Sequence, residues 1–106
     1  MMLTIEVFKP KHCVLYHNAV EIQSWALNCL DAGCNYLLLD LQNVSFIDSS
    51  GLGILVSTFE SVRRRGGILA LSSLQGQVSM IIEVCELSDF FPTYANRPDF
   101  ERAIAI

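Results

Sequence analysis

The chain has 106 residues, of which 52% are hydrophobic and 17% are charged, and its formal net charge is −4. This composition supplies enough apolar surface for one packed core and excludes a disordered chain. The negative charge disfavours binding to nucleic acid or to an anionic membrane surface, because both need a basic face on the protein. We therefore expect a single domain over residues 1–106.

The sequence contains no pattern typical of membrane insertion or secretion. Asp40 and Asp48 interrupt the longest apolar stretch, so no run reaches the ~18 residues that a membrane helix needs. The first residues lack a basic segment followed by an apolar core, and no secretory signal is expected. We predict a cytoplasmic protein.

The four cysteines do not form a C-x-x-C pair, and no metal site or cofactor is expected. In a reducing compartment, free cysteines are most often buried side chains without a chemical role. We expect plain packing for all four: Cys13, Cys29, Cys34 and Cys85.

The first third of the chain predicts two strands and a helix. Apolar and polar residues alternate over residues 3–8, which is typical of a half-buried strand, and residues 13–16 predict a second one. Asn18 followed three residues later by Glu21 has the form of a capping box and predicts the start of a helix. Gly33 predicts its end.

The rest of the chain alternates between predicted strands and helices, which indicates the α/β class with a mixed sheet. The continuous apolar run 36–41 predicts a central strand that is buried on both faces. After Gly51, apolar residues recur at helical spacing and predict a helix. The arginines 63–65 predict its end, because positive charges suit the negative end of a helix dipole. The remaining expected elements are a strand at 68–71, a helix at 78–85, an edge strand at 92–95 and a last helix at 96–104.

The stretch Asp48-Ser49-Ser50-Gly51 separates two strongly apolar runs. We expect it where the central strand's carboxyl end leads into a helix, which is where α/β sheets place their sites. Asp48 or Ser49 can cap that helix, which stabilises it by about 1 kcal/mol. A cap alone does not explain the second hydroxyl, or the glycines Gly51 and Gly53, which would let a partner's backbone approach closely.

Three sharper interpretations of this stretch can be compared. A phosphate-binding loop lacks the third glycine of the dinucleotide motif and the lysine of a P-loop. A serine hydrolase needs a glycine two positions before its nucleophile, where Ser50 has Asp48. The third interpretation is that a serine is itself a substrate: a phosphate at a helix N-terminus is tolerated by the dipole and adds about −1.5 to −2 charges to the surface.

The sequence from residue 36 onward resembles the STAS-domain anti-anti-sigma factors. The residues that carry the resemblance are LLLDLQNVSFIDSSGLGILV, then VRRRGGILALSSL, VSMIIEVCEL and DFFPTYANRPDFERAI. The resemblance implies a STAS fold with a mixed sheet of four to five strands and about four helices. It also implies a bacterial partner-switching regulator of transcription that is not an enzyme.

The resemblance further implies the partners and the site. The unphosphorylated form would bind an anti-sigma factor that is also a serine kinase of the histidine-kinase ATPase type. A PP2C-type phosphatase would reverse the modification, and a weak homodimer is a further expected contact. The phosphoacceptor implied is Ser49, and the partner-binding residues are Asp48, Ser49, Ser50, Gly51 and Leu52.

The first third departs from the family pattern. Family members carry a Gly-x-Leu-Asp motif between the second strand and the first helix, whereas residues 12–15 read His-Cys-Val-Leu here. The alternative function, from a different class, is a STAS scaffold or ligand-sensing module that is not regulated by phosphorylation, and a small hydrolase is a third hypothesis.

Overall fold

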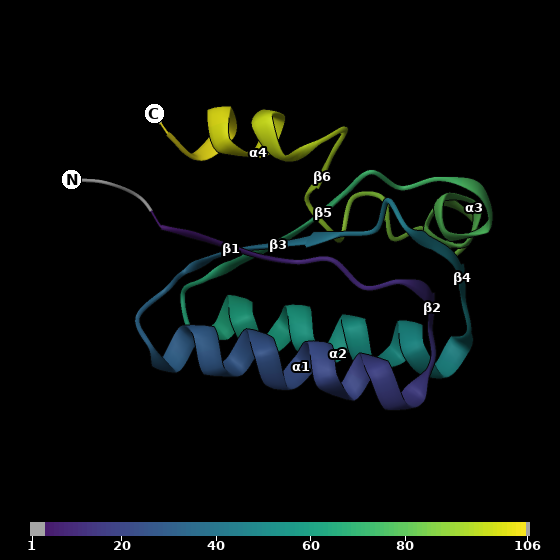
Figure 1. The fold of residues 1–106 in the computed structure, drawn as a ribbon, viewed down its shortest axis with the longest axis horizontal. Coiled ribbons are helices and arrows are strands. Elements are labelled where there is room, and N and C mark those ends of the chain that lie inside the picture. Colours follow the sequence, from purple (N-terminus) through teal and green to yellow (C-terminus); the bar gives the residue numbers. More distant parts are fainter. Residues whose placement is uncertain (1–3, 106) are drawn as a thin grey trace.

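A parallel four-stranded sheet lies between helices in the computed structural model, which describes residues 4–105 (Figure 1). Two parallel strands outside this sheet form a separate pair. The strands of the main sheet, in spatial order, are β1 (Ile5–Phe8), β3 (Tyr36–Asp40), β5 (Ile68–Ser72) and β6 (Thr93–Tyr94). The separate pair consists of β2 (His12–Val14) and β4 (Val44–Ile47), and the helices are α1 (Tyr16–Asp31), α2 (Ser49–Arg64), α3 (Gly76–Val84) and α4 (Arg97–Ile104).

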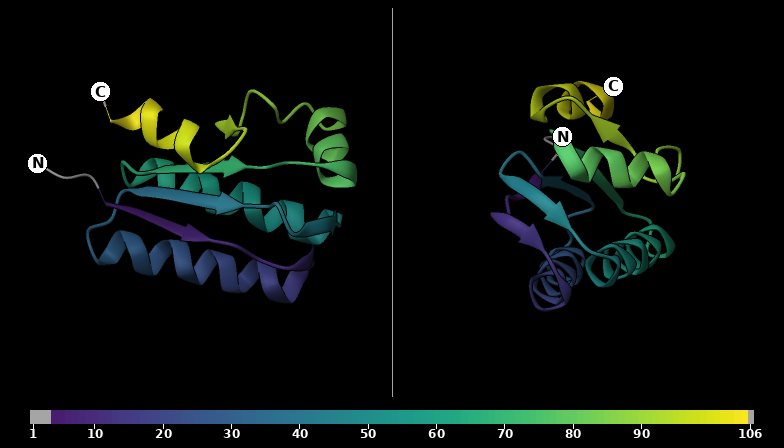
Figure 2. Two further views of the ribbon diagram at one scale, coloured as in Figure 1. Left: turned by 45° about the horizontal axis from the view of Figure 1, so that its top comes forward. Right: turned by 90° about the vertical axis from the view of Figure 1, so that its right-hand side faces the viewer.

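Strand β3 is buried on both faces, as its continuous apolar run predicts. Leu37 and Leu39 belong to the larger core, which the sheet forms with α1 and α2. Leu38 points the other way and packs with Ala70 and Phe100 under α4. Figure 2 shows α1 and α2 side by side on one face of the sheet and α4 on the other. Successive residues of β3 therefore contribute to two separate hydrophobic cores, one on each face of the sheet.

The predicted helix after Gly51 is confirmed as α2. Leu55, Phe59 and Val62 are its buried apolar residues, spaced so that they face the sheet. Gly66 follows the helix with φ of +82°, a conformation that favours glycine. The predictions of β5, α3, the edge strand β6 and α4 are also confirmed.

The α/β class and the four helices agree with the sequence-based expectation, but the strand pairing differs. Every strand pair among residues 4–105 is parallel, whereas a mixed sheet was expected. In the main sheet each strand returns to its neighbour through a crossover that contains a helix, and such connections join parallel strands.

Strand β4 was not predicted. Its sequence VSFI does not alternate between apolar and polar residues. In the structure Val44 and Ile47 are buried, while Ser45 and Phe46 are exposed. Pairing with β2, from a distant part of the chain, forms this strand. The Asp48–Gly51 turn consequently follows β4, and the expectation that it follows the central strand was wrong.

The start of the first helix also differs from the expectation. The second strand ends at Val14, and α1 begins at Tyr16 with Leu15 as its N-cap. Asn18 is not the cap. Its side chain accepts a hydrogen bond from the Leu15 N–H at 2.6 Å and donates one to the Cys13 carbonyl. Of the first predicted strand, Leu3 lies outside the described residues, and β1 begins at Ile5.

Candidate functional site

The Asp48–Gly51 turn lies at a corner where two helices begin. Val14 and Ile47 are register partners in the β2–β4 pair. Because both strands run the same way and both lead directly into helices, α1 and α2 begin side by side at this corner (Figure 1, right). The free N–H groups and positive dipole ends of two helices therefore point toward one region of the surface.

Asp48 caps α2, as predicted. Its Oδ1 atom accepts a hydrogen bond from the Gly51 N–H at 2.7 Å, and its backbone conformation is extended, as in most N-caps. Its own N–H donates to the Val14 carbonyl at 3.3 Å. Asp48 thus connects the first turn of α2 to the end of β2, and its carboxylate is committed to the fold.

Gly51 is buried and lies against the backbone of Val14. A Cβ atom at this position would overlap the Val14 carbonyl oxygen and lie 2.8 Å from the carbonyl carbon. The interpretation that Gly51 leaves room for a partner's backbone is therefore wrong, because the chain's own backbone occupies that space. Gly53 has no atom within 4 Å of such a Cβ and lies on the exposed side of α2.

Ser49 and Ser50 are the first two residues of α2, and both are exposed. Ser49 was predicted to be accessible at this helix N-terminus, and both parts of that prediction are confirmed. Leu52 in the same turn is half-buried and packs against the larger core. The turn therefore presents two serines to solvent, while Leu52 and Gly51 attach it to the interior.

Two large apolar side chains near this corner were missed by the sequence analysis. Tyr16, the first residue of α1, is 64% exposed, and Phe46, in β4, is 46% exposed. Tyr16 had been assigned to a strand, and β4 had not been recognised. Their exposure depends on the β2–β4 pairing, which no local pattern indicates.

The outer edge of β4 is paired with a side chain from α3. The Gln77 amide accepts a hydrogen bond from the Ile47 N–H at 2.9 Å and donates one to the Ile47 carbonyl at 3.0 Å. One amide side chain thus replaces a neighbouring strand at the residue directly before Asp48. The position of the turn is fixed from both sides, by β2 and by Gln77.

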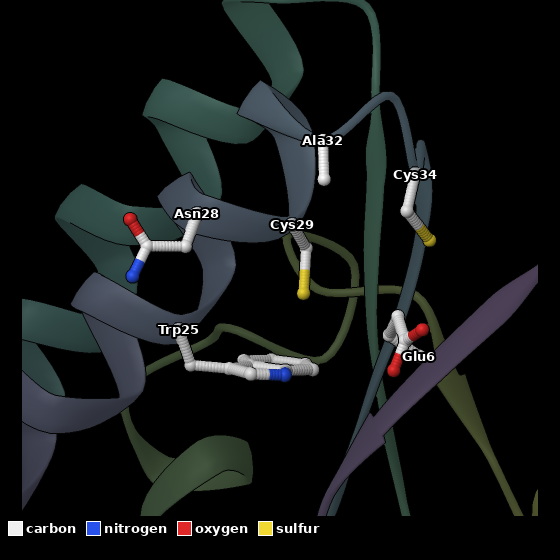
Figure 3. Close-up of a pocket in the computed structure, with 6 residues that line it drawn as sticks. All are labelled: Glu6, Trp25, Asn28, Cys29, Ala32 and Cys34. Carbon is white, nitrogen blue, oxygen red and sulfur yellow. The ribbon is translucent and has the colours of Figure 1, made fainter.

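The cysteines do not all lie in the core, and the expectation of four buried thiols was wrong. Cys34 is buried, Cys13 and Cys29 are half-buried, and Cys85 is exposed. Cys85 is the C-cap residue of α3, and it lies at an exposed end of that helix although its neighbours in sequence are apolar. Cys29 and Cys34 line a cleft beside β1 (Figure 3).

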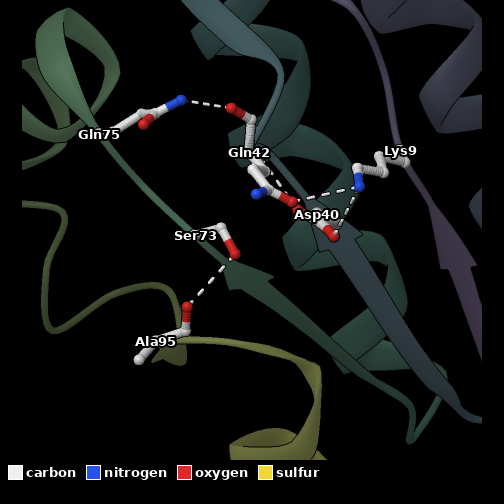
Figure 4. Close-up of polar contacts among 6 residues, drawn as sticks. All are labelled: Lys9, Asp40, Gln42, Ser73, Gln75 and Ala95. Atoms are coloured by element: carbon white, nitrogen blue, oxygen red, sulfur yellow. Dashed lines mark hydrogen bonds and ion pairs between the residues drawn. The ribbon is translucent and has the colours of Figure 1, made fainter.

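Polar side chains also gather at the carboxyl end of the main sheet (Figure 4). The Lys9 ammonium lies 4.0 Å from the Asp40 carboxylate and 3.2 Å from Gln42 Oε1. Gln75 donates to the Gln42 carbonyl and links α3 to this edge. These polar groups are bonded to one another, so we assign them a structural role in connecting the ends of the strands and not a catalytic one.

The described part of the chain contains neither a metal-binding cluster nor a membrane-spanning helix. Between residues 4 and 105, no three His, Cys, Asp or Glu side chains come together as a metal-binding group. Within the same range, no helix is both long and apolar enough to cross a membrane.

The fold and the turn together define an α/β domain whose candidate site is an exposed pair of serines at a helix N-terminus. The STAS domain family model matches residues 4–99, and the chain belongs to that family. The resemblance noted in the sequence is thereby confirmed.

Two curated bacterial relatives are anti-sigma factor antagonists. The anti-sigma F factor antagonist of Paenibacillus polymyxa is 30% identical over 63 residues, which is 59% of this chain and 54% of the relative. The anti-sigma-B factor antagonist of Bacillus subtilis is 38% identical over 60 residues, which is 57% of this chain and 55% of the relative. The matched segment thus spans about half the length of each.

Two solved structures share the fold. The crystal structure of protein TM1081 from Thermotoga maritima has a TM-score of 0.84 at 25% identity, covering 94% of this chain and 86% of that one. The anti-sigma factor antagonist SpoIIAA in its unphosphorylated form has a TM-score of 0.68 at 18% identity, covering 99% of this chain and 91% of that one. The STAS fold class is therefore established for this chain.

Proposed function

We propose that this chain is a cytoplasmic anti-sigma factor antagonist, formed as a single STAS domain over residues 1–106 and switched by phosphorylation of Ser49. In its unphosphorylated form it binds an anti-sigma factor that is also a serine kinase of the histidine-kinase ATPase type. Phosphorylation releases it, and a PP2C-type phosphatase restores binding. The chain itself acts by binding and catalyses no reaction.

The observation that carries this proposal is the exposed Ser49 hydroxyl at the first residue of α2. A kinase needs an accessible hydroxyl, and a helix N-terminus stabilises the phosphate that results. The neighbouring Asp48 carboxylate is already bonded to the Gly51 N–H. We therefore expect this cap to remain in place when Ser49 carries a phosphate.

The proposed partner surface contains Asp48, Ser49, Ser50, Gly51 and Leu52. Of these, the two serines are the exposed members, and Gly51 supports the surface from below. We add the exposed rings of Tyr16 and Phe46, which lie on the elements that meet at this corner. Aromatic side chains are enriched at protein interfaces, where they bury large areas.

Release follows from the cost of burying the phosphate. The modification places about −1.5 to −2 charges in the middle of the interface. A partner without matching cations would have to desolvate that charge, which costs several kcal/mol. The occurrence of a relative in both states supports such a switch: SpoIIAA has been solved in unphosphorylated and phosphorylated forms.

The experiment combines a pulldown from the source cell with phosphosite mapping and affinity measurements. The kinase recovered in the pulldown is incubated with ATP and this chain, and the modified residue is identified by mass spectrometry. Ser49→Ala should bind this kinase and resist phosphorylation, whereas Ser49→Asp should fold normally and bind poorly. Ser50→Ala is the matched control and should still be phosphorylated. Phosphate on Ser50 alone would move the role by one residue.

The second candidate function is a STAS scaffold or ligand-sensing module without phosphorylation. The observation that favours it is the N-cap of α1, where Leu15 stands in place of the acid of the family motif. It is supported if phosphorylated protein and Ser49→Asp bind the partner as well as the unmodified chain does. An ester-substrate screen tests the third hypothesis, a small hydrolase.

A further inference from the structure

A cleft of about 440 Å³ lies between the carboxyl-terminal half of α1 and the edge strand β1 (Figure 3). Its volume falls in the range of small-molecule sites. Among residues 4–105, β1 is an edge strand of the main sheet, and the cleft lies beside it. Its lining residues are Glu6, Trp25, Asn28, Cys29, Ala32 and Cys34.

The lining is mostly apolar and contains one flat aromatic surface. Trp25 is half-buried, and its ring packs against Phe8 at a centroid distance of 5.3 Å, which holds the indole in place. In Figure 3 the Cys29 sulfur points toward the indole ring, and the Asn28 amide points away from it. The Cys34 thiol is held by contacts with the carbonyls of Thr4 and Tyr36. Two of the lining side chains, Trp25 and Cys34, are therefore held in place by packing and by hydrogen bonds.

Among the described residues that line the cleft, Glu6 is the one with a charged side chain. Burial, followed by the nearby Cys34 and Glu6, raises the pKa of the Cys29 thiol, so that thiol stays neutral at pH 7. The Glu6 carboxylate is thus the fixed charge that the described lining residues present to the cleft. A phosphate or carboxylate ligand would meet this anion without a compensating cation.

We propose that this cleft binds a small, flat aromatic cation, whose ring stacks against Trp25 and whose charged nitrogen donates hydrogen bonds to the Glu6 carboxylate. An indole face attracts cations through its quadrupole, and a carboxylate accepts charge-assisted hydrogen bonds. The combination selects a cationic ring over a neutral or anionic one of the same shape.

This site is separate from the proposed phosphorylation site. Tyr16 begins α1 at the corner shared with Ser49, whereas Cys29 lies in the last part of the same helix, about 20 Å further along its axis. Binding in the cleft can therefore be tested with protein that is never phosphorylated. Failure of either proposal leaves the other unaffected.

The test uses benzamidinium as the probe and benzamide as its neutral counterpart. Trp25 is the single tryptophan of the chain, so its fluorescence reports on this cleft alone. We expect benzamidinium to change the Trp25 fluorescence in a saturable way and to shift the Trp25 indole N–H signal in NMR spectra. Benzamide should bind about tenfold more weakly, which is the loss expected for one partly exposed charge-assisted contact.

Two variants and one control complete the test. Glu6→Gln should reduce benzamidinium affinity to that of benzamide, and Ala32→Leu should weaken both probes by filling the cleft. Glu83→Gln removes the same charge from an exposed position on α3 and should change neither affinity. Equal binding of the two probes, shifts confined to other residues, or the absence of saturable binding would each overturn the proposal.

Discussion

Gly51 packs directly against the carbonyl of Val14, so the first turn of α2 lies on the end of β2 with no side chain between them. We predict that Gly51→Ala destabilises the domain by about 1–3 kcal/mol, because the added methyl group must displace backbone atoms. The free energy of unfolding, measured in urea, tests this prediction.

Gly53 provides the matched control for that substitution. It lies in the same helix, but a Cβ at this position meets no atom within 4 Å. Gly53→Ala should therefore stabilise the domain by about 0.5–1 kcal/mol through improved helix propensity. The prediction fails if both substitutions change stability in the same direction.

Asp48→Ala should lower the free energy of unfolding by about 1 kcal/mol, because the Gly51 N–H loses its acceptor. Asp48→Asn retains an oxygen at the same place and should cost only a fraction of this amount. Thermal melting of the two variants beside the unmodified chain provides the measurement. Equal losses for both would show that the negative charge, rather than the hydrogen bond, stabilises the helix.

Gln77→Ala should destabilise the domain by about 1–3 kcal/mol, because it leaves the N–H and carbonyl of Ile47 without their partners. Hydrogen exchange at the Ile47 amide should accelerate more than exchange at Leu38 in the main sheet. Ser79→Ala, on the same helix and without a side-chain contact of this kind, serves as the comparison. Unchanged protection at Ile47 would contradict the role assigned to Gln77.

Phosphorylation of Ser49 is expected to leave the fold intact. A negative charge in the first turn interacts favourably with the helix dipole, typically by 0.3–1 kcal/mol. The melting temperature of phosphorylated protein should therefore be equal to or slightly above that of unmodified protein. A fall of several degrees would mean that the modification acts by disturbing the domain instead of by changing its surface.

The cysteines should react with iodoacetamide in an order set by exposure, with Cys85 first and Cys34 last. Burial raises the pKa of Cys29, so its alkylation rate should continue to rise with pH beyond the range usual for a thiol. The folded state holds this proton more tightly than the unfolded state does. The protonated Cys29 thiol therefore contributes to the stability of the folded state. This contribution is present below the pKa of an unfolded cysteine and is lost as the pH rises through the folded pKa. Peptide mapping at several pH values gives the individual rates.

Local sequence patterns predicted the features that depend on the residues of a single strand or helix. The apolar run of β3 predicted burial on both faces, and the spacing of Leu55 and Phe59 predicted the buried face of α2. The position of Ser49 followed from the same spacing together with the Asp48 cap.

Features that depend on distant segments could not be predicted in this way. Strand β4 exists because β2 and Gln77 pair with its two edges, and neither is near it in sequence. Asn18 was predicted as the N-cap, but it is the third residue of α1, and its side chain bonds the Leu15 N–H and the Cys13 carbonyl. The requirement for glycine at position 51 comes from Val14, which no local pattern connects to it.

The separate packing of Leu38 has a consequence for how the domain forms during synthesis. Its face of the sheet is covered by Phe100 of α4, and α4 is the last helix of the described chain. The other face can assemble with α1 and α2 while translation continues, since its helices emerge from the ribosome earlier. The nascent chain therefore carries one uncovered apolar sheet face until α4 has been translated, and it is exposed to aggregation over that interval.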